Sequence, residues 1–186
     1  MQWNLPNIIT LTRIAMIPVF MVCLYSELTC AGWIAVAIFA VASLTDGIDG
    51  YIARKYNQVT TFGKFIDPLA DKLLVISALL IFVDLGSMPV AAAMIVITRE
   101  LAVTSLRTVA ISQGVTIAAG ISGKVKTFTQ ICCIILMLTP FAVISLFMIG
   151  GLTVTINTVV VAIMVLVTIW SGIDYFVQYK DLFKLQ

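Results

Sequence analysis

Long apolar stretches, separated by short polar or charged connections, dominate the chain. Each stretch is about as long as a bilayer-crossing helix, which needs roughly 20 apolar residues. The pattern predicts six transmembrane helices, at residues 8–25, 33–53, 65–83, 90–110, 128–149 and 153–177. A short N-terminal segment with Trp3 and Pro6 is predicted to lie at the membrane interface. We therefore predict an all-α integral membrane protein, with one six-helix bundle and a single domain over residues 1–186.

The composition supports a membrane protein and excludes sites that depend on histidine. Hydrophobic residues make up 61% of the chain and charged residues 11%, and the mean hydropathy is +1.13, well above a soluble domain. The chain has no histidine, which excludes histidine metal sites and a Ser-His-Asp triad. Its four cysteines lie in apolar stretches, where cysteine usually acts as a small hydrophobe. We expect no nucleic-acid partner.

The charged loops are divided unequally between the two membrane faces. On one face the predicted loops carry only Glu27 and Asp84. The loops and tail of the other face carry the basic residues Arg54, Lys55, Lys64, Lys124, Lys126, Lys180 and Lys184. By the positive-inside rule the basic face is cytoplasmic, and both termini lie on it.

Two pairs of aspartates stand within predicted helices. Asp46 and Asp49 lie one turn apart, as do Asp67 and Asp71, because a helix advances about 100° per residue. The short connection over residues 55–64 predicts antiparallel neighbours, so the four carboxylates would converge near the cytoplasmic face. Unrelated surface charges at loop ends are the simpler alternative. Ionisable groups inside membrane helices are costly, however, and four at helical spacing favour a functional site.

Four converging carboxylates would repel one another unless cations neutralise them. Oxygen ligands without histidine or cysteine clusters favour Mg²⁺, Mn²⁺ or Ca²⁺ over zinc or copper. Two such ions on either side of a phosphate would stabilise both the attacking and the departing oxygen. The small residues Gly47, Gly50, Ala53 and Gly63 would let a planar or phosphorylated ligand approach the helices closely, although close helix packing alone is an alternative.

Together these residues match a known signature. Residues 46–71 read Asp-x2-Asp-Gly-x2-Ala-Arg-x8-Gly-x3-Asp-x3-Asp, which resembles the signature of the CDP-alcohol phosphatidyltransferase family at every specified position. Three other segments resemble bacterial phosphatidylglycerophosphate synthases: residues 4–13, residues 98–100 with Arg107, and residues 123–127. The resemblance covers nearly the whole chain.

The resemblance implies a six-helix homodimer in the bacterial cell (inner) membrane, with its active site open to the cytoplasm. It also implies two divalent ions, Mg²⁺ or Mn²⁺, and a role for Asp71 in deprotonating the acceptor hydroxyl. The implied metal ligands are Asp46, Asp49, Asp67 and Asp71. The implied contacts to the CDP group are Gly50, Ala53, Arg54 and Gly63, with Asn7 and Thr10 as further candidates.

The implied reaction joins CDP-diacylglycerol and glycerol 3-phosphate to give phosphatidylglycerophosphate and CMP. An acceptor with its own phosphate needs a cationic pocket, for which the candidates are Arg99, Arg107, Lys124 and Lys126. Each lysine has an equally plausible role in binding lipid headgroups or setting the topology. Glu100 is expected either to pair with an arginine or to orient the pocket.

Three alternatives remain open from the sequence. Synthases of phosphatidylserine, of cardiolipin or of the phosphatidylinositol type share the aspartate signature, although the basic residues disfavour serine as acceptor. A divalent-cation transporter would also need membrane aspartates, but basic residues on the same face would repel its cargo. A purely structural membrane subunit gives no reason for the carboxylates.

Overall fold

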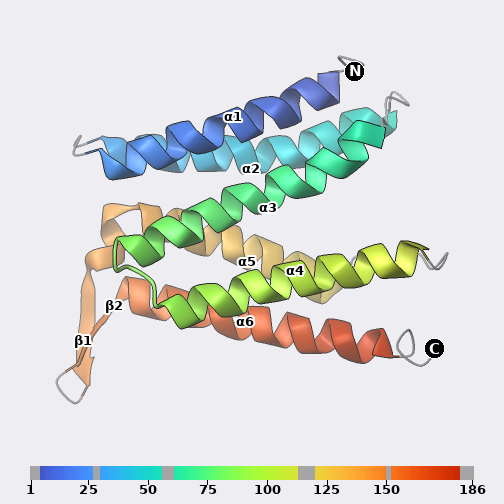
Figure 1. Cartoon of the computed structure of the whole chain (residues 1–186). Helices are drawn as coiled ribbons and strands as arrows, with labels where there is room; N and C mark the ends of the chain where they lie inside the picture. Colours follow the sequence, from blue (N-terminus) through green and yellow to red (C-terminus); the bar gives the residue numbers. More distant parts are fainter. Residues whose placement is uncertain (1–4, 27–29, 56–60, 113–119, 150–151, 181–186) are drawn as a thin grey trace. The chain divides into compact units, whose positions relative to one another are not determined.

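The computed structural model describes residues 5–26, 30–55, 61–112, 120–149 and 152–180. In these ranges the long elements are the α-helices α1 (Leu5–Tyr25), α2 (Ala31–Lys55), α3 (Thr61–Asp84), α4 (Val90–Ser112), α5 (Ile121–Leu138) and α6 (Ile156–Gln178) (Figure 1). A 3-10 helix (Pro140–Val143) and two short strands, β1 (Ser145–Ile149) and β2 (Leu152–Thr155), connect α5 to α6. The chain divides into a first unit, Met1–Leu85 with Leu138–Pro140, and a second unit, Gly86–Met137 with Phe141–Gln186.

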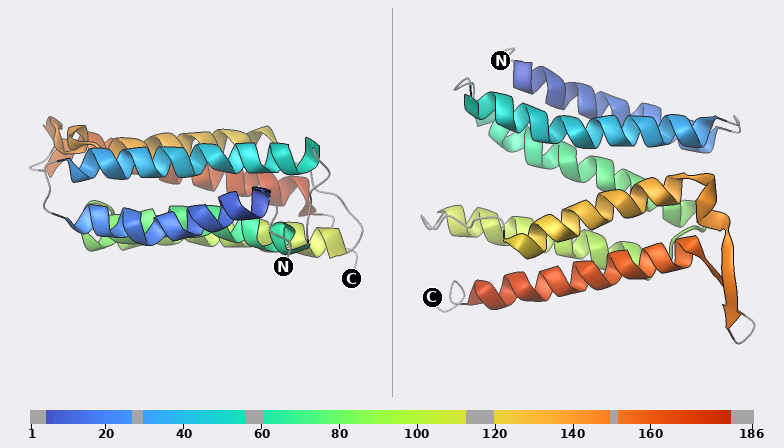
Figure 2. Two further views of the ribbon diagram at one scale, coloured as in Figure 1. Left: turned by 90° about the horizontal axis from the view of Figure 1, so that it is seen from above. Right: turned by 180° about the vertical axis from the view of Figure 1, so that it is seen from behind.

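In the first unit, α1 packs along both α2 and α3, whereas α2 and α3 touch each other over a shorter stretch (Figure 2). The rings of Phe20 and Phe39 meet between α1 and α2 with their centroids 6.0 Å apart. The buried face of α2 follows three- and four-residue spacing and consists of Phe39 with the alanines Ala31, Ala35 and Ala42. Small side chains let helices approach closely in a membrane, where packing rather than water exclusion drives association.

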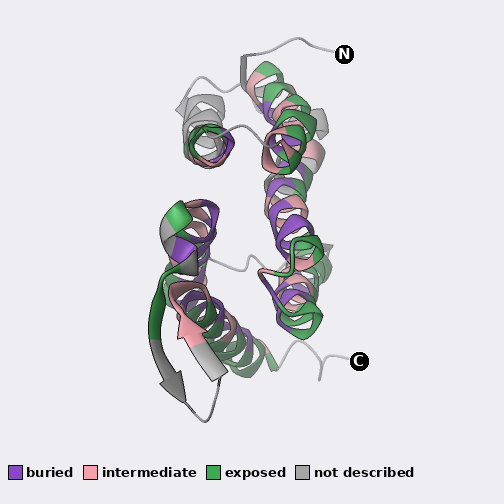
Figure 3. Cartoon of the chain, turned by 90° about the vertical axis from the view of Figure 1, so that its left-hand side faces the viewer, coloured by how far each residue is buried: buried purple, intermediate pink, exposed green. Residues whose placement is uncertain are grey.

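In the second unit, α4 lies beside α6 and the two helices run in the same direction (Figures 1 and 2). The side chain of Thr155 caps α6 by accepting a hydrogen bond from the backbone N–H of Thr158 at 3.3 Å. One stripe of α6 is buried: Val160, Val161, Met164, Thr168, Ser171, Gly172 and Tyr175. The other positions are exposed or partly buried, so one helix carries a buried and a more exposed side (Figure 3). This pattern is typical of a membrane helix with one protein-facing side.

The described helices fit a membrane protein. Three of them contain stretches long and apolar enough to cross a bilayer, at Ile8–Tyr25, Ile121–Leu138 and Ile156–Gln178, and α2 contributes a shorter apolar stretch, Ala31–Thr45. The charged residues Lys72, Arg99, Glu100 and Arg107 lie within α3 and α4. The fold is mostly helical, as predicted, and the count of six crossings stays a prediction.

The predicted bounds of the fifth helix, residues 128–149, are wrong. The helix α5 spans Ile121–Leu138, and residues 145–149 form β1, which pairs with β2 in antiparallel register, with Met148 opposite Thr153. Pro140 explains the early end, because the residue before a proline is disfavoured in helical conformation. At the N-terminus, residues 5–7 already belong to α1, while residues 1–4 of the predicted interfacial segment lie outside the described residues.

Candidate active site

The four signature aspartates lie on the backbone of two helices of the first unit. Asp46 and Asp49 fall in the last part of α2, and Asp67 and Asp71 in the first half of α3. Both pairs are therefore near the helix ends that residues 56–60 connect. The side chains of all four lie outside the described residues, as do those of Asn7, Gly50, Ala53, Arg54 and Gly63. Their convergence around metal or CDP stays a prediction.

The chemistry of the aspartates suits a hard divalent cation. Among the residues whose side chains are described, no three metal-ligating groups cluster, so these four aspartates remain the candidate ligands. They supply only carboxylate oxygens, the donors that Mg²⁺ and Mn²⁺ prefer.

Two polar residues of α1 are buried in the first unit. Thr10, a predicted CDP contact, is 0% exposed, and Arg13 is 1% exposed. Arg13 lies three residues after Thr10, so the two occupy neighbouring positions on one face of α1. Sequence reasoning did not assign Arg13 to the site, although a charge inside an apolar span is a signal of function.

Arg99 of α4 is half-buried in the second unit. Its Nε atom is buried and has no hydrogen-bond partner among the described residues. Its side chain passes over Gly172 of α6, where an added Cβ would lie 3.3 Å from Arg99 Cγ. Gly172 thus leaves the room that the arginine needs, a role that the sequence alone did not indicate.

A groove of about 710 Å³ runs between α4 and α6 beside Arg99. Its walls are mostly apolar and include Met94, Ile95, Ile169, Ile173 and Phe176. Arg99 and Lys180 are the charged residues in its lining. The guanidinium is therefore held against an apolar surface, where an anion would be attracted strongly.

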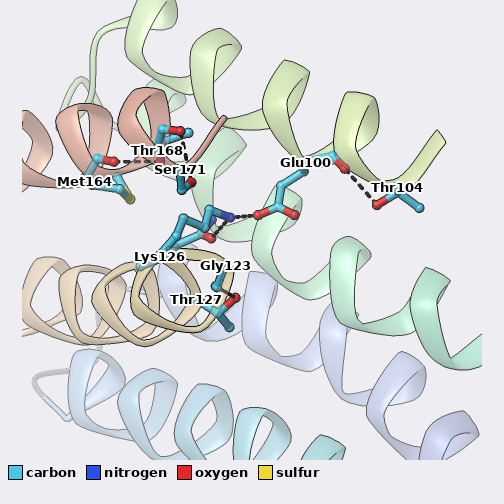
Figure 4. Close-up of polar contacts among 9 residues, drawn as sticks. Glu100, Thr104, Gly123, Lys126, Thr127, Met164, Thr168 and Ser171 are labelled. Carbon is cyan, nitrogen blue, oxygen red and sulfur yellow. Dashed lines mark hydrogen bonds and ion pairs between the residues drawn. The ribbon is translucent and has the colours of Figure 1, made fainter. Parts of the chain in front are cut away.

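Lys126 and Glu100 form an ion pair inside the second unit (Figure 4). Lys126 is 1% exposed, and its ammonium reaches from α5 to the carboxylate of Glu100 on α4. It also donates a hydrogen bond to the side-chain oxygen of Gln130, one turn further along α5. The predicted pairing of Glu100 with an arginine is not what the structure shows, because its observed partner is a lysine. The sequence analysis did not identify Gln130, although its spacing of four residues from Lys126 is a signal that could have found it.

Two hydroxyl groups near the pair are satisfied by their own helix, whereas the side-chain nitrogen of Gln130 is buried without a hydrogen-bond partner among the described residues. The hydroxyl groups of Thr168 and Ser171 donate to carbonyls of their own helix, at 2.6 Å to Met164 and 3.1 Å to Thr168 (Figure 4). Arg107 and Lys124, the other two candidates for the acceptor phosphate, are exposed. The structure thus separates the four basic candidates into one buried, one half-buried and two exposed side chains.

Comparison with known proteins defines the class. A family model described as CDP-alcohol phosphatidyltransferase matches residues 3–171, and the chain belongs to this family of membrane enzymes.

Curated relatives show which members of the family the chain is similar to. The chain is 43% identical to the CDP-diacylglycerol–glycerol-3-phosphate 3-phosphatidyltransferase of Bacillus subtilis, over 77% of this chain and 82% of that protein. It is 43% identical to a probable phosphatidylglycerophosphate synthase of Mycobacterium tuberculosis, over 92% of this chain and 79% of that protein. The protein from Escherichia coli with the same name as that of B. subtilis is 32% identical, over 94% of both chains.

These matches confirm the family predicted from the aspartate signature. They also confirm the prediction that the protein is an enzyme, a phosphatidyltransferase. The alternatives of a cation transporter and of a structural subunit are therefore set aside.

Proposed function

We propose that this protein transfers the phosphatidyl group of CDP-diacylglycerol to glycerol 3-phosphate, giving phosphatidylglycerophosphate and CMP in phospholipid synthesis. The observation that carries the proposal is the 43% identity to a relative whose name states that reaction. The half-buried Arg99 and the buried Lys126 add support from the structure, because an acceptor with its own phosphate requires fixed cations.

In the proposed reaction, Asp71 accepts the proton of the acceptor hydroxyl as its oxygen attacks the phosphorus of the phosphatidyl group. A new P–O bond forms, the bond to the CMP phosphate oxygen breaks, and CMP leaves with the bonding electrons. Divalent ions bound to Asp46, Asp49, Asp67 and Asp71 would neutralise the diphosphate and the departing CMP. The small residues Gly50, Ala53 and Gly63, with Arg54, Asn7 and Thr10, would border the CDP group.

The basic residues of the second unit would bind the acceptor phosphate. Arg99 presents a guanidinium Nε without a hydrogen-bond partner in the described part of the chain, and a phosphate oxygen would satisfy it. Lys126 supplies an ammonium that Glu100 and Gln130 hold in place. The exposed Arg107 and Lys124 would attract the anion without binding it tightly, since exposed charges are screened by water and salt.

The placement in the cell follows from the charge pattern. The basic loops support a multi-pass protein of the bacterial inner membrane, with both termini and the active site on the cytoplasmic side. There the active site would be open to a water-soluble acceptor such as glycerol 3-phosphate. The family resemblance supports a homodimer, which cross-linking of the purified protein in detergent would test.

An acceptor panel tests the proposal directly. Purified protein is given CDP-diacylglycerol and Mg²⁺ with one labelled acceptor at a time: glycerol 3-phosphate, serine, inositol, inositol phosphate or phosphatidylglycerol. We expect lipid-bound label and an equal amount of CMP with glycerol 3-phosphate. Faster transfer to phosphatidylglycerol or to an inositol compound would instead assign a cardiolipin or phosphatidylinositol-type synthase and would refute the proposed acceptor.

A further inference from the structure

The Glu100–Lys126 pair is the most deeply buried pair of opposite charges among the described residues of the second unit. Lys126 is 1% exposed and the side chain of Glu100 is 19% exposed. Gln130, which accepts a hydrogen bond from the ammonium, is 3% exposed. The three side chains therefore form a small polar cluster that joins α4 to α5 away from water.

A lysine at this depth requires an acid beside it. A buried ammonium without a counter-charge tends to lose its proton, because the low-dielectric interior disfavours the charged form. The carboxylate of Glu100 compensates the positive charge of the ammonium, and the amide oxygen of Gln130 fixes its direction. Removing one partner of such a pair leaves the other charge uncompensated, which is more costly than losing both.

The position of the pair connects it to the acceptor. Glu100 directly follows Arg99 in α4, so the pair ties α5 to the same turn of α4 that carries the half-buried arginine. Around it, the hydroxyl groups of Thr168 and Ser171 donate to their own backbone. Lys126 is thus a buried cation of the second unit, and its ion pair joins it to the residue that follows Arg99.

We propose that Glu100 is a positioning residue for the acceptor phosphate: its carboxylate, together with the amide of Gln130, holds the Lys126 ammonium in place and so sets the preference for a phosphorylated acceptor. This inference rests on the proposed function. Glu100 itself does not touch the acceptor, because a carboxylate beside a phosphate would repel it. Its effect passes through Lys126, and the arriving phosphate shares the ammonium with the carboxylate.

A double-mutant cycle tests the inference, using the full-length protein in detergent with CDP-diacylglycerol and labelled glycerol 3-phosphate. The variants are Glu100→Gln, Lys126→Met and the two combined, with the KM of each substrate and kcat measured separately. Glu100→Gln is expected to raise the acceptor KM about tenfold or more, with the donor KM and kcat within about threefold of wild type. In the double variant, Glu100→Gln should add nothing to the effect of Lys126→Met, because its target is gone.

Further variants separate positioning from folding. Glu100→Asp, which retains the charge on a shorter arm, should recover part of the acceptor affinity, and Gln130→Met should raise the acceptor KM by only about threefold. Asp84→Asn removes a carboxylate that accepts a hydrogen bond from Tyr25 in the first unit, and it should leave both KM values unchanged. The thermal midpoint of each purified variant shows which ones remain folded.

Several outcomes would overturn the inference. One is that Glu100→Gln lowers kcat and raises both KM values by similar factors, in a protein with the thermal midpoint of wild type. Another is a full additional effect of Glu100→Gln on the Lys126→Met background. If Glu100→Gln does not fold, the inference is tested with Glu100→Asp and Gln130→Met. A wild-type acceptor KM in both variants would refute the inference. Absence of labelled product from the wild type would refute the proposed function instead, so the two failures are distinguishable.

Discussion

The two units carry their charges in different ways. In the first unit, α2 and α3 carry the four signature aspartates at regular helical spacing, together with the basic residues Arg54, Lys55, Lys64 and Lys72. In the second unit the ionisable residues are mainly basic, scattered over α4, α5 and the end of α6, and they differ widely in burial. Regular spacing made the acidic residues recognisable from sequence. For the basic residues, burial in the structure was needed to separate the buried and half-buried side chains from the exposed ones.

This difference corresponds to two chemical tasks. Divalent ions and a diphosphate require several oxygen ligands at fixed separation, which a helix supplies through residues one turn apart. A single acceptor phosphate requires only one or two cations in the right place, and these need no repeating pattern. We therefore assign the donor to the signature aspartates of the first unit, with Arg54 beside the CDP group, and the acceptor to the basic residues of the second unit. The following experiments are designed to break that division.

Removal of divalent ions should have the largest effect. Chelation of the purified protein is expected to lower CMP release by more than about a hundredfold, because the diphosphate charge would no longer be neutralised. Addition of Mg²⁺ or Mn²⁺ should restore it. Undiminished CMP release after exhaustive chelation would remove the role assigned to the aspartates.

Loss of the proton acceptor should come next. Asp71→Asn is expected to lower kcat by about 10²- to 10⁴-fold, because an amide cannot take up the hydroxyl proton. Single-turnover assays with preformed protein–donor complex would isolate this step. Asp84→Asn is the matched control outside the signature and should keep wild-type turnover. Near-normal turnover in Asp71→Asn would assign the proton transfer to another group.

On the basic side, Arg99→Gln should raise the KM for glycerol 3-phosphate by roughly ten- to a hundredfold, as the loss of a charged hydrogen bond from a half-buried position predicts. The same change at the exposed Arg107 should raise it by only about two- to fivefold, because water and salt screen that charge. Equal effects at both positions would show that burial does not decide which cation binds the phosphate.

The smallest expected effect concerns the room that Arg99 occupies. Gly172→Ala places a methyl group 3.3 Å from Arg99 Cγ, so the arginine must shift by a few tenths of an ångström. We expect the acceptor KM to rise about two- to fivefold, with the donor KM unchanged. Gly123→Ala is the matched control, since its added Cβ meets nothing within 4 Å. The same rise in both variants would exclude a specific role for Gly172.

Much of the fold was predictable from the apolar stretches, because helices that cross a bilayer must be long and apolar. Five of the six described helices, α1 to α4 and α6, overlap their predicted ranges closely. The fifth differs, since Pro140 ends α5 and two short strands follow. Gly150 and Gly151 between two apolar runs were a hairpin signal that the expectation of another crossing helix obscured.

The candidate site was predictable only where residue spacing carries information. The aspartates follow from the signature, and the family match confirms the class of enzyme they indicate. An orienting role for Glu100 was one of two expectations, but its partner did not follow, because Lys126 is 26 residues away and their contact depends on where α4 and α5 lie in the fold. Gly172 was unpredictable for the same reason, since its importance arises from the arginine that lies over it.

Ligand binding without turnover tests the division between the two units most directly. CDP, the soluble part of the donor, and glycerol 3-phosphate are each titrated into purified wild type, Asp46→Asn and Lys126→Met in the presence of Mg²⁺. The account predicts that Asp46→Asn weakens CDP binding more than about tenfold, while Lys126→Met leaves CDP binding within about twofold and weakens glycerol 3-phosphate binding more than about tenfold. Loss of CDP binding in Lys126→Met, with glycerol 3-phosphate binding intact, would contradict it.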